Sequence, residues 1–415
     1  MRDYSEQEKV TVYIIVEQEM PTSPKDNIII DTNLERVSEE IIEKEKNTTE
    51  QLKVVKSLNI SFTQLGHEEC EICEAHKIHC KSENHDKDSI FDDCVKCLDY
   101  RNHKSRALKA RKLYLKHKEE KENEPNHIYY STDLEKVIML PRLETFKEVV
   151  FCQRLVAFNQ TFAPIGKSNT NPYAVLWHEA IAGRKQEDII SAFNVFLMQS
   201  RDYNFIDLWL DNCAAQNKNW LLYFYLVHII NSSAISAKQD NLNYFESGHT
   251  FMSCDHFHHQ VELSMKRKKK LHDFQDFIEA VSAANTAKVT VKEMKTFDFI
   301  NVIDYTSPRR IQTSNPRAYM RNMVQVIFKR GSFNLFYKTD FDGEVNELTF
   351  LKDTYLKSKT GPVSVITSRT NPRGIKTSRK ENILKKLSKF MLPYKQTFWK
   401  NLPTNDNEKT DSDEE

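Results

Sequence analysis

Cysteine and histidine are concentrated in one short stretch, and this concentration constrains the fold more than any other feature of the chain. Five of the eight cysteines lie between residues 70 and 97. They form two Cys-x2-Cys pairs and one single cysteine: Cys70 and Cys73, Cys94 and Cys97, and Cys80. The N-terminus, MRDYSEQEKV, has no apolar signal region, so we expect an intracellular chain in which such clustered cysteines bind metal.

The spacing of the two pairs predicts a structural zinc ion. Twenty residues separate them, which fits a four-cysteine site, and each pair can turn two thiolates toward one tetrahedral ion. The predicted ligands are Cys70, Cys73, Cys94 and Cys97. Spare donors leave a three-cysteine, one-histidine site or a second zinc ion open: His76, His79, Cys80, His85 and His103. The alternative is a set of reduced, buried cysteines beside exposed histidines.

Changes in composition divide the chain into five segments. Residues 1–60 are a polar N-terminal extension with one charged helix, and 61–125 hold the zinc-binding module and a basic helix. Residues 126–290 are richer in apolar strings, and 291–360 are predicted to be a small C-terminal α/β extension. Residues 361–415 are basic and then acidic, so we expect a largely disordered tail. We find no internal repeat and no apolar run of about 18 residues that would span a membrane.

The order of apolar strings within residues 126–290 predicts an α/β fold. Three strand-like strings come first, followed by a helix, a strand, a helix, a strand and a long helix. A meander of three strands followed by alternating helices and strands is the topology of an RNase H-like mixed sheet. The predicted architecture is therefore an RNase H-like domain preceded by a small zinc-binding module and a basic helix.

Acidic residues fall at the ends of these predicted strands. Asp133 is in the first strand, Asp211 ends the strand FIDLWLD, and Asp255 opens the last helix, with Glu262 two turns on. In an RNase H-like fold the first and fourth strands are adjacent, so acids on them converge with an acid from the later helix. Such a pocket suits two Mg²⁺ or Mn²⁺ ions for chemistry at phosphorus. Each acid alone also has a structural interpretation, such as a helix cap for Asp255.

Several strings resemble a eukaryotic, transposon-derived family of largely uncharacterised function, many of whose members are insect or other animal open reading frames of mobile-element origin. The resemblance covers roughly residues 62–290 and rests on four strings: YSTDLEKVIMLPRL, WHEAIAGR, DNCAAQNKNW and SGHTFMSCDHFHHQVE. It implies a Cys/His segment joined to an RNase H-like transposase domain, with Asp133, Asp211 and Asp255 at the acidic positions. His258 and Glu262 fall in the last motif. The family's N-terminal region looks shortened or replaced here, which puts specific DNA recognition in doubt.

A dense basic run follows these motifs on the last predicted helix. It consists of Lys266, Arg267, Lys268, Lys269 and Lys270. A solvated helix face is the usual meaning of such a run, but beside the acids it predicts contact with nucleic-acid phosphates. The basic segment 369–400 favours a nuclear location, with the cytoplasm as the alternative. Gly166-Lys167-Ser168 lacks the earlier glycine of a phosphate loop, so nucleotide hydrolysis is excluded.

The sequence thus predicts a transposase-derived DNA-processing protein that uses structural zinc and catalytic Mg²⁺ or Mn²⁺. Expected partners are DNA and a further copy of the chain, with no membrane and no small-molecule substrate. The alternative is an inactive nucleic-acid-binding or protein-interaction module that zinc stabilises. Intact acids favour activity, whereas the altered N-terminal region favours the binding module. A third reading is a zinc-stabilised nuclear scaffold with no role at DNA.

Overall fold

The computed structural model consists of two compact units, Met1–His67 and Glu68–Glu415. In the first unit the structure describes one antiparallel pair of short strands, β1 (Ile14–Ile15) and β2 (Ser61–Phe62). The charged helix predicted within residues 1–60 lies outside the described residues. In the second unit the described residues are 70–85, 93–120, 126–143, 146–166, 170–213, 217–357 and 365–407.

A mixed ten-stranded sheet forms the centre of the second unit, which confirms the predicted α/β class. Its middle strands are β3 (His127–Leu134), β5 (Leu155–Pro164), β6 (Tyr173–His178), β7 (Phe205–Leu210) and β8 (Gln239–Tyr244). They lie in the spatial order β6-β5-β3-β7-β8. The pairs β3–β5 and β5–β6 are antiparallel, whereas β3–β7 and β7–β8 are parallel. The three-strand meander and the later parallel strands therefore meet at β3.

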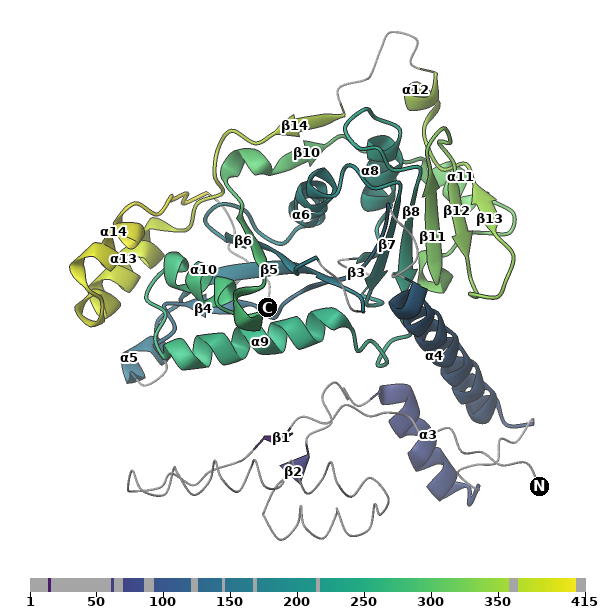
Figure 1. The fold of residues 1–415 in the computed structure, drawn as a ribbon, viewed down its shortest axis with the longest axis horizontal. Coiled ribbons are helices and arrows are strands. Elements are labelled where there is room, and N and C mark those ends of the chain that lie inside the picture. The colour runs from purple at the N-terminus through teal and green to yellow at the C-terminus, as the bar shows by residue number, and fades with distance from the viewer. Residues whose placement is uncertain are drawn as a thin grey trace. The chain divides into compact units, whose positions relative to one another are not determined.

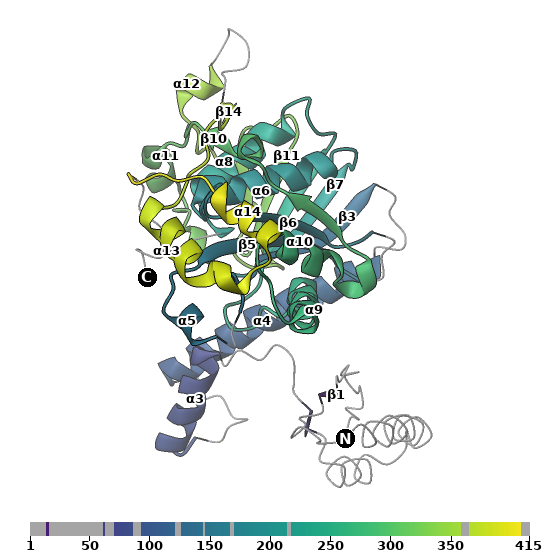
Figure 2. The same ribbon diagram turned by 90° about the vertical axis from the view of Figure 1, so that its left-hand side faces the viewer.

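Helices cover both faces of this sheet (Figures 1 and 2). On one face α6 (Gln186–Gln199) and α8 (Trp220–Ile230) pack on alternate strand residues, which form the largest core. On the other face, α9 (Ser253–Lys268) and α10 (Phe274–Ser282) enclose a second core. The strand residues alternate accordingly, since Leu208 faces the first core while Trp209 faces the opposite side.

The Cys/His module is a hairpin of two helices, and the second helix extends until it packs against the sheet. It consists of α3 (Glu71–Ser82) and α4 (Val95–Glu120), and α4 contains the predicted basic helix. Farther along α4, Ala110 and Tyr114 pack against Trp209 and Phe245 in a third, small core. The ring of Tyr114 meets Trp209 edge-on at 5.3 Å between ring centroids. The module is therefore joined to the sheet through the second half of α4.

The segment predicted as a small C-terminal extension does not form a unit of its own. Its strands are β9 (Thr290–Glu293), β10 (Ile300–Val302), β11 (Gln325–Lys329), β12 (Leu335–Lys338) and β13 (Asn346–Leu348). β9 pairs with β6, and β11 pairs with β8 and with β12, so both edges of the main sheet are extended. This segment is part of the main sheet, because the buried Val326 and Phe328 belong to the same core as the central strands.

The disordered tail was also wrong for residues 365–407. They contain β14 (Ile366–Ser368), α13 (Thr377–Leu387) and α14 (Pro393–Lys400). Trp399, Ile383 and Leu387 are fully buried in the second core. These apolar residues are interspersed with many Lys and Arg residues, so the composition of the segment did not indicate a buried face. One of its basic residues, Arg379, is itself buried and forms an ion pair with Glu179 at 2.6 Å. Residues 408–415 lie outside the described residues.

Short elements complete the unit. They are β4 (Ile138–Leu140), α5 (Lys147–Val150), α11 (Pro308–Gln312), α12 (Asp353–Leu356) and the 3-10 turns Asn285–Ala287, Thr296–Asp298, Met320–Asn322 and Ser388–Phe390. Among the described residues, no helix has the length and apolarity needed to cross a membrane.

Candidate metal centres

Both Cys-x2-Cys pairs lie at the N-terminus of a helix. Cys70 is the N-cap of α3 and Cys73 lies in its first turn. Cys94 directly precedes α4 and Cys97 lies in its first turn. A helix N-terminus carries partial positive charge, which favours a thiolate over a thiol. The pKa of Cys94 is lowered, chiefly because it accepts a backbone N–H from Cys97. Local structure thus prepares both pairs to bind a metal ion.

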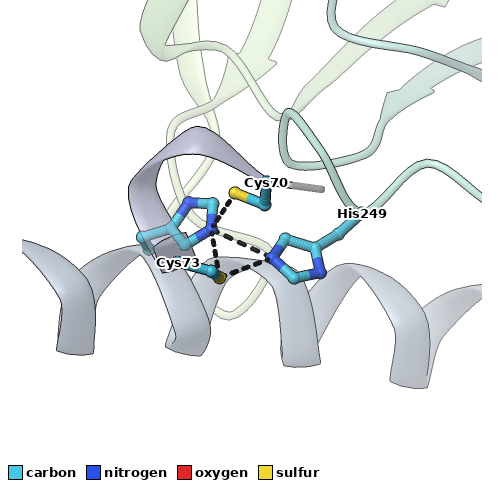
Figure 3. A group of neighbouring side chains, drawn as sticks. Cys70, Cys73 and His249 are labelled. Carbon is cyan, nitrogen blue, oxygen red and sulfur yellow. Dashed lines mark hydrogen bonds between the residues drawn. The ribbon is translucent and has the colours of Figure 1, made fainter. Parts of the chain in front are cut away.

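The first pair belongs to a group that we call the spanning cluster. It consists of Cys70, Cys73, His103 and His249. Nε2 of His103 lies 3.2 Å from Sγ of Cys70 and 3.6 Å from Sγ of Cys73. Nε2 of His249 lies 3.4 Å from Sγ of Cys73 and 3.0 Å from Nε2 of His103. Figure 3 shows the His249 ring, from the loop between β8 and α9, turned toward the thiol of Cys73.

The second pair belongs to a separate group, the hairpin cluster. It consists of His79, His85, Cys94 and Cys97. Nε2 of His79 lies 3.2 Å from Sγ of Cys94, and Nδ1 of His85 lies 3.5 Å from Sγ of Cys97. All four donors come from the helical hairpin itself. In both clusters the four donor atoms lie within 4.8 Å of one another.

The donor geometry of both clusters fits zinc. A tetrahedral zinc ion with bonds of about 2.0–2.3 Å separates its ligand atoms by roughly 3.3–3.8 Å. The donor separations described above, 3.0–3.6 Å, are close to that range. Two thiolates and two imidazoles make a closed set of four, which is typical of a structural site. Both Cys/His clusters can therefore hold a metal such as zinc.

A carboxylate outside the spanning cluster orients one of its ligands. His103 is fully buried, and its Nδ1 lies 3.0 Å from Oε1 of Glu246. Glu246 is itself held by Arg106, whose guanidinium donates to both of its oxygens at 2.7 and 2.9 Å. With Nδ1–H donated to a carboxylate, Nε2 presents its lone pair to the cysteines. This carboxylate–histidine arrangement accompanies metal-bound histidine in many proteins.

The structure divides the four cysteines that the spacing assigned to one ion. Each pair is instead completed by a histidine from the other helix of the hairpin. A Cys-x2-Cys-x5-His pattern occurs twice, at 70–79 and 94–103. This repeat could have indicated two metal sites instead of one. Because the helices run antiparallel, His103 reaches the first pair and His79 the second. The two remaining predicted donors, His76 and Cys80, contact each other and belong to neither cluster.

A third group contains predicted acidic residues. Donor atoms of Asp133 on β3 and of Asp255 and His258 on α9 all lie within 4.8 Å of one another. We call this group the carboxylate cluster. Burial, with the neighbouring Asp211 and Asp255, raises the pKa of Asp133 well above its ordinary value. Burial lowers the pKa of His258 to about 3, and its buried Nε2 has no hydrogen-bond partner among the described residues.

Asp211 lies beside this cluster without being part of it. It directly follows β7, the parallel neighbour of β3. Its Oδ1 accepts a hydrogen bond from the side-chain amide of Asn217 and another from the backbone N–H of Cys213 at 3.2 Å. Asn217 therefore orients Asp211.

Glu262 does not join the acids. Both of its oxygens accept from the guanidinium of Arg142, at 2.8 and 3.1 Å, and this ion pair lowers its pKa. Of the two predicted acids on α9, Asp255 groups with Asp133 and Glu262 does not. Asp255 also accepts the backbone N–H of Met252 at 2.6 Å, so it supports the start of α9 as well.

Two titratable residues near the acids were not singled out from the sequence. Lys218 is buried, donates to the carbonyl of Met323 at 2.7 Å, and has its pKa lowered to about 8 by burial. Glu135 is buried beside Asn159, and burial raises its pKa to about 7. Nothing in the local pattern marks either residue, because their burial depends on distant strands.

Two members of the basic run at the end of α9 contact other side chains of the protein. Lys268 contacts Glu279 and, at 3.1 Å, Asp276, while Lys270 lies over the ring of Phe146 at 5.1 Å. The remaining members are exposed: Lys266, Arg267 and Lys269.

One comparison with known proteins bears on these sites. Residues 193–333 match the model of a family described as a domain of unknown function, DUF7869. The match spans His249, Asp211 and Asp255 and leaves out Asp133 and both Cys-x2-Cys pairs. No curated protein and no solved structure matches the chain.

Proposed function

We propose that this chain is a transposase-derived protein of RNase H-like fold that cleaves phosphodiester bonds in DNA at the carboxylate cluster. The strand order β6-β5-β3-β7-β8, with an antiparallel meander and two parallel strands, supports the fold assignment. The order places the first strand of the meander beside the fourth. Acids at those two positions are then adjacent whatever their distance along the chain.

The observation that carries the proposal is the carboxylate cluster of Asp133, Asp255 and His258, with Asp211 beside it at the end of the neighbouring strand β7. Carboxylates crowded together repel one another, so their proximity costs stability unless a cation neutralises it. Burial, and after it the charges of Asp211 and Asp255, raises the pKa of Asp133 well above its ordinary value. Destabilising arrangements of this kind concentrate at functional sites. A structural role alone explains Asp255 as a helix cap but leaves the position of Asp133 unexplained.

In the proposed reaction these side chains hold divalent ions. Mg²⁺ or Mn²⁺ bound there supplies charge that activates a nucleophile and stabilises the leaving oxygen at phosphorus. Asp133, Asp211 and Asp255 provide the oxygen ligands that such ions prefer, and His258 lies next to them. Asn217 keeps Asp211 in place through its amide. The exposed Lys266, Arg267 and Lys269 supply phosphate contacts that position DNA without reading its sequence.

The test is DNA cleavage by the full-length purified chain. Fluorescently labelled single-stranded, duplex and hairpin DNA is incubated with Mn²⁺ or Mg²⁺, and products are resolved on denaturing gels. We expect Mn²⁺-dependent cleavage that Asp133→Asn and Asp211→Asn each reduce by at least about 100-fold, because each removes a charged ligand. Asp202→Asn is the matched control, since that acid lies on an exposed turn, with its side chain 87% exposed.

The assay separates this proposal from the inactive binding module. Glu262 is committed to Arg142, and Asp211 to Asn217, an arrangement that is also stable without metal. A binding module predicts salt-sensitive DNA binding with no cleavage and no difference between Asp211→Asn and the wild type. Folding of each variant is checked by circular dichroism, and manganese binding is followed by electron paramagnetic resonance. Manganese that binds equally to wild type and Asp133→Asn contradicts the proposed site.

A further inference from the structure

The loop between β8 and α9 is fastened to α4 along its whole length. At its start, Glu246 pairs with Arg106 at 2.7 Å. At its middle, Arg111 donates to the carbonyl of Phe251 at 2.7 Å. At its end, the hydroxyl of Tyr114 lies 2.9 Å from Oγ of Ser253 and accepts the Ser253 N–H at 3.0 Å.

The same loop also packs directly on the spanning cluster. Gly248 has φ +74°, a conformation that side chains other than glycine rarely adopt. A Cβ at Gly248 would lie 2.7 Å from Cβ and 2.9 Å from Sγ of Cys70, so only glycine permits this approach. The next residue, His249, supplies the fourth donor of the cluster. The loop therefore supplies His249 as a ligand, and its Gly248 leaves space for the side chain of Cys70.

The loop leads straight into the first turn of α9. Met252 is the N-cap of that helix, and its backbone N–H is bonded to Asp255. Cys254 donates its backbone N–H to Ser131 on β3 at 3.0 Å, which sets the start of α9 against the strand that carries Asp133. Only five residues lie between His249 and Asp255 in sequence. A shift of the loop would thus move Asp255 and His258 relative to Asp133.

We propose that Cys70, Cys73, His103 and His249 bind one zinc ion that fastens the β8–α9 loop to the helical hairpin and thereby positions Asp255. A second zinc ion is held by the hairpin cluster alone. We call this link between the loop and the hairpin the zinc tie. The zinc tie involves a structural ion and does not depend on the proposed function, whereas the importance of positioning Asp255 rests on that function. His249 is a positioning residue in this scheme, because it touches no substrate.

The first experiment counts zinc in the full-length chain by elemental analysis and native mass spectrometry. We expect two zinc ions per wild-type chain and one in His249→Asn, with the remaining ion lost when Cys97→Ser is added. His249→Cys should restore the second ion, because a thiolate replaces the imidazole. Two ions retained in His249→Asn, or a single ion in the wild type that either Cys73→Ser or Cys97→Ser abolishes, would overturn the proposal.

The second experiment follows the loop by hydrogen–deuterium exchange. His249→Asn should raise exchange at least about tenfold in residues 246–258, whereas Cys97→Ser should leave them unchanged and affect α3 and the start of α4. Equal exchange in both variants contradicts the positioning role. X-ray absorption at the zinc edge of the wild type needs no variant. An average shell of two sulfurs and two nitrogens is expected, and four sulfurs would refute the interleaved clusters.

These outcomes are independent of DNA cleavage. A wild-type chain with two zinc ions and no cleavage would reject the proposed function and keep the zinc tie. A chain that cleaves DNA while His249→Asn retains both ions would reject the tie and keep the function.

Discussion

The two Cys/His clusters use the same four donors, two thiols and two imidazoles, yet they join very different parts of the chain. The hairpin cluster takes all its ligands from residues 79–97, whereas the spanning cluster takes them from residues 70–249. The first closes a hairpin of two helices. The second connects that hairpin to the central sheet, at the loop that precedes Asp255. Identical ligand chemistry therefore serves local folding in one case and assembly of the unit in the other.

The two clusters also differ in the hydrogen-bond partners of their histidine ligands. In the spanning cluster, Nδ1 of His103 is bonded to Glu246, a residue that follows β8. In the hairpin cluster, Nδ1 of His79 is buried without a hydrogen-bond partner among the described residues. A carboxylate partner orients a ligand and raises its basicity. The sheet thus supplies the spanning cluster with support that the hairpin cannot provide for its own.

The largest expected effect comes from removing metal altogether. The buried residues of α3 are only His76, His79 and Cys80, so this helix has almost no apolar core. Chelation should therefore unfold α3 and the start of α4, because structural zinc contributes on the order of 10 kcal/mol to such modules. The sheet should persist, with its own large cores. Hydrogen–deuterium exchange before and after chelation measures this, and protection of α3 that survives chelation would contradict it.

A glycine substitution should break the spanning cluster selectively. Gly248→Ala introduces a Cβ that meets Cys70 at 2.7 Å, and we expect the loss of one zinc ion per chain. Gly331→Ala is a matched control, since Gly331 also has positive φ, +85°, but has nothing within 4 Å of the added Cβ. Both variants bear a similar backbone cost of about 1 kcal/mol. Equal zinc content in the two would show that the loop does not approach Cys70 this closely.

The buried acid Asp240, on β8, makes the stability of the sheet depend on pH in a different direction from zinc binding at the clusters. Burial, followed by the charge of Asp207, raises the pKa of Asp240 from 3.8 to about 8. Between these values the folded chain keeps a proton that the unfolded chain releases, so stability falls as pH rises and levels off above about pH 8. The clusters have the opposite dependence, because protons compete with zinc as pH falls.

Asp240→Asn should accordingly stabilise the protein at pH 8 by on the order of a few kcal/mol, with the gain vanishing near pH 4. Denaturant unfolding across this pH range measures the difference, and Asp202→Asn serves as an exposed control. A variant that is equally stable to the wild type at pH 8 would mean that the Asp240 carboxyl is not protonated in the folded chain.

A smaller change should weaken the spanning cluster without abolishing it. Glu246→Gln keeps the size of the side chain but removes the charge that orients His103, and such changes typically cost 10- to 100-fold in metal affinity, or about 1.4–2.7 kcal/mol. Competition with a chromophoric chelator should show weaker binding of one zinc ion and no change in the other. Glu74→Gln is the control, since Glu74 forms an exposed ion pair with Lys77 on α3. Equal weakening of both ions would contradict the separation of the clusters.

The smallest expected effect tests the hydrogen-bonded part of the loop attachment. Tyr114→Phe removes the hydroxyl that meets Ser253 and leaves the Ser253 N–H without this partner. We expect a loss of about 1 kcal/mol in unfolding free energy, with zinc content unchanged. Tyr394→Phe is the exposed control. Loss of a zinc ion in Tyr114→Phe would indicate that this hydrogen bond, and not the metal, holds the loop.

Local patterns of the sequence predicted much of this protein. Apolar spacing identified the strands and helices of residues 126–290, and charge identified the basic helix within α4. The Cys-x2-Cys pairs marked metal ligands, because two thiols within one helical turn can meet one ion. The prediction failed for α13 and α14, where basic residues concealed the apolar positions of Ile383, Leu387 and Trp399. Local composition cannot report burial that a distant core provides.

Which residues are suited to bind metal, and which segments form helices and strands, depends on neighbours a few positions apart, so these features can be predicted from the sequence. How the ligands are shared depends on the folded chain. The antiparallel hairpin exchanged the histidines between the two cysteine pairs, and the return of the chain after β8 brought His249 to Cys70 and Cys73. The packing of α9 against β3 likewise places Asp133 beside Asp255, 122 residues later in the chain. Such contacts depend on chain topology, which spacing along the sequence does not contain.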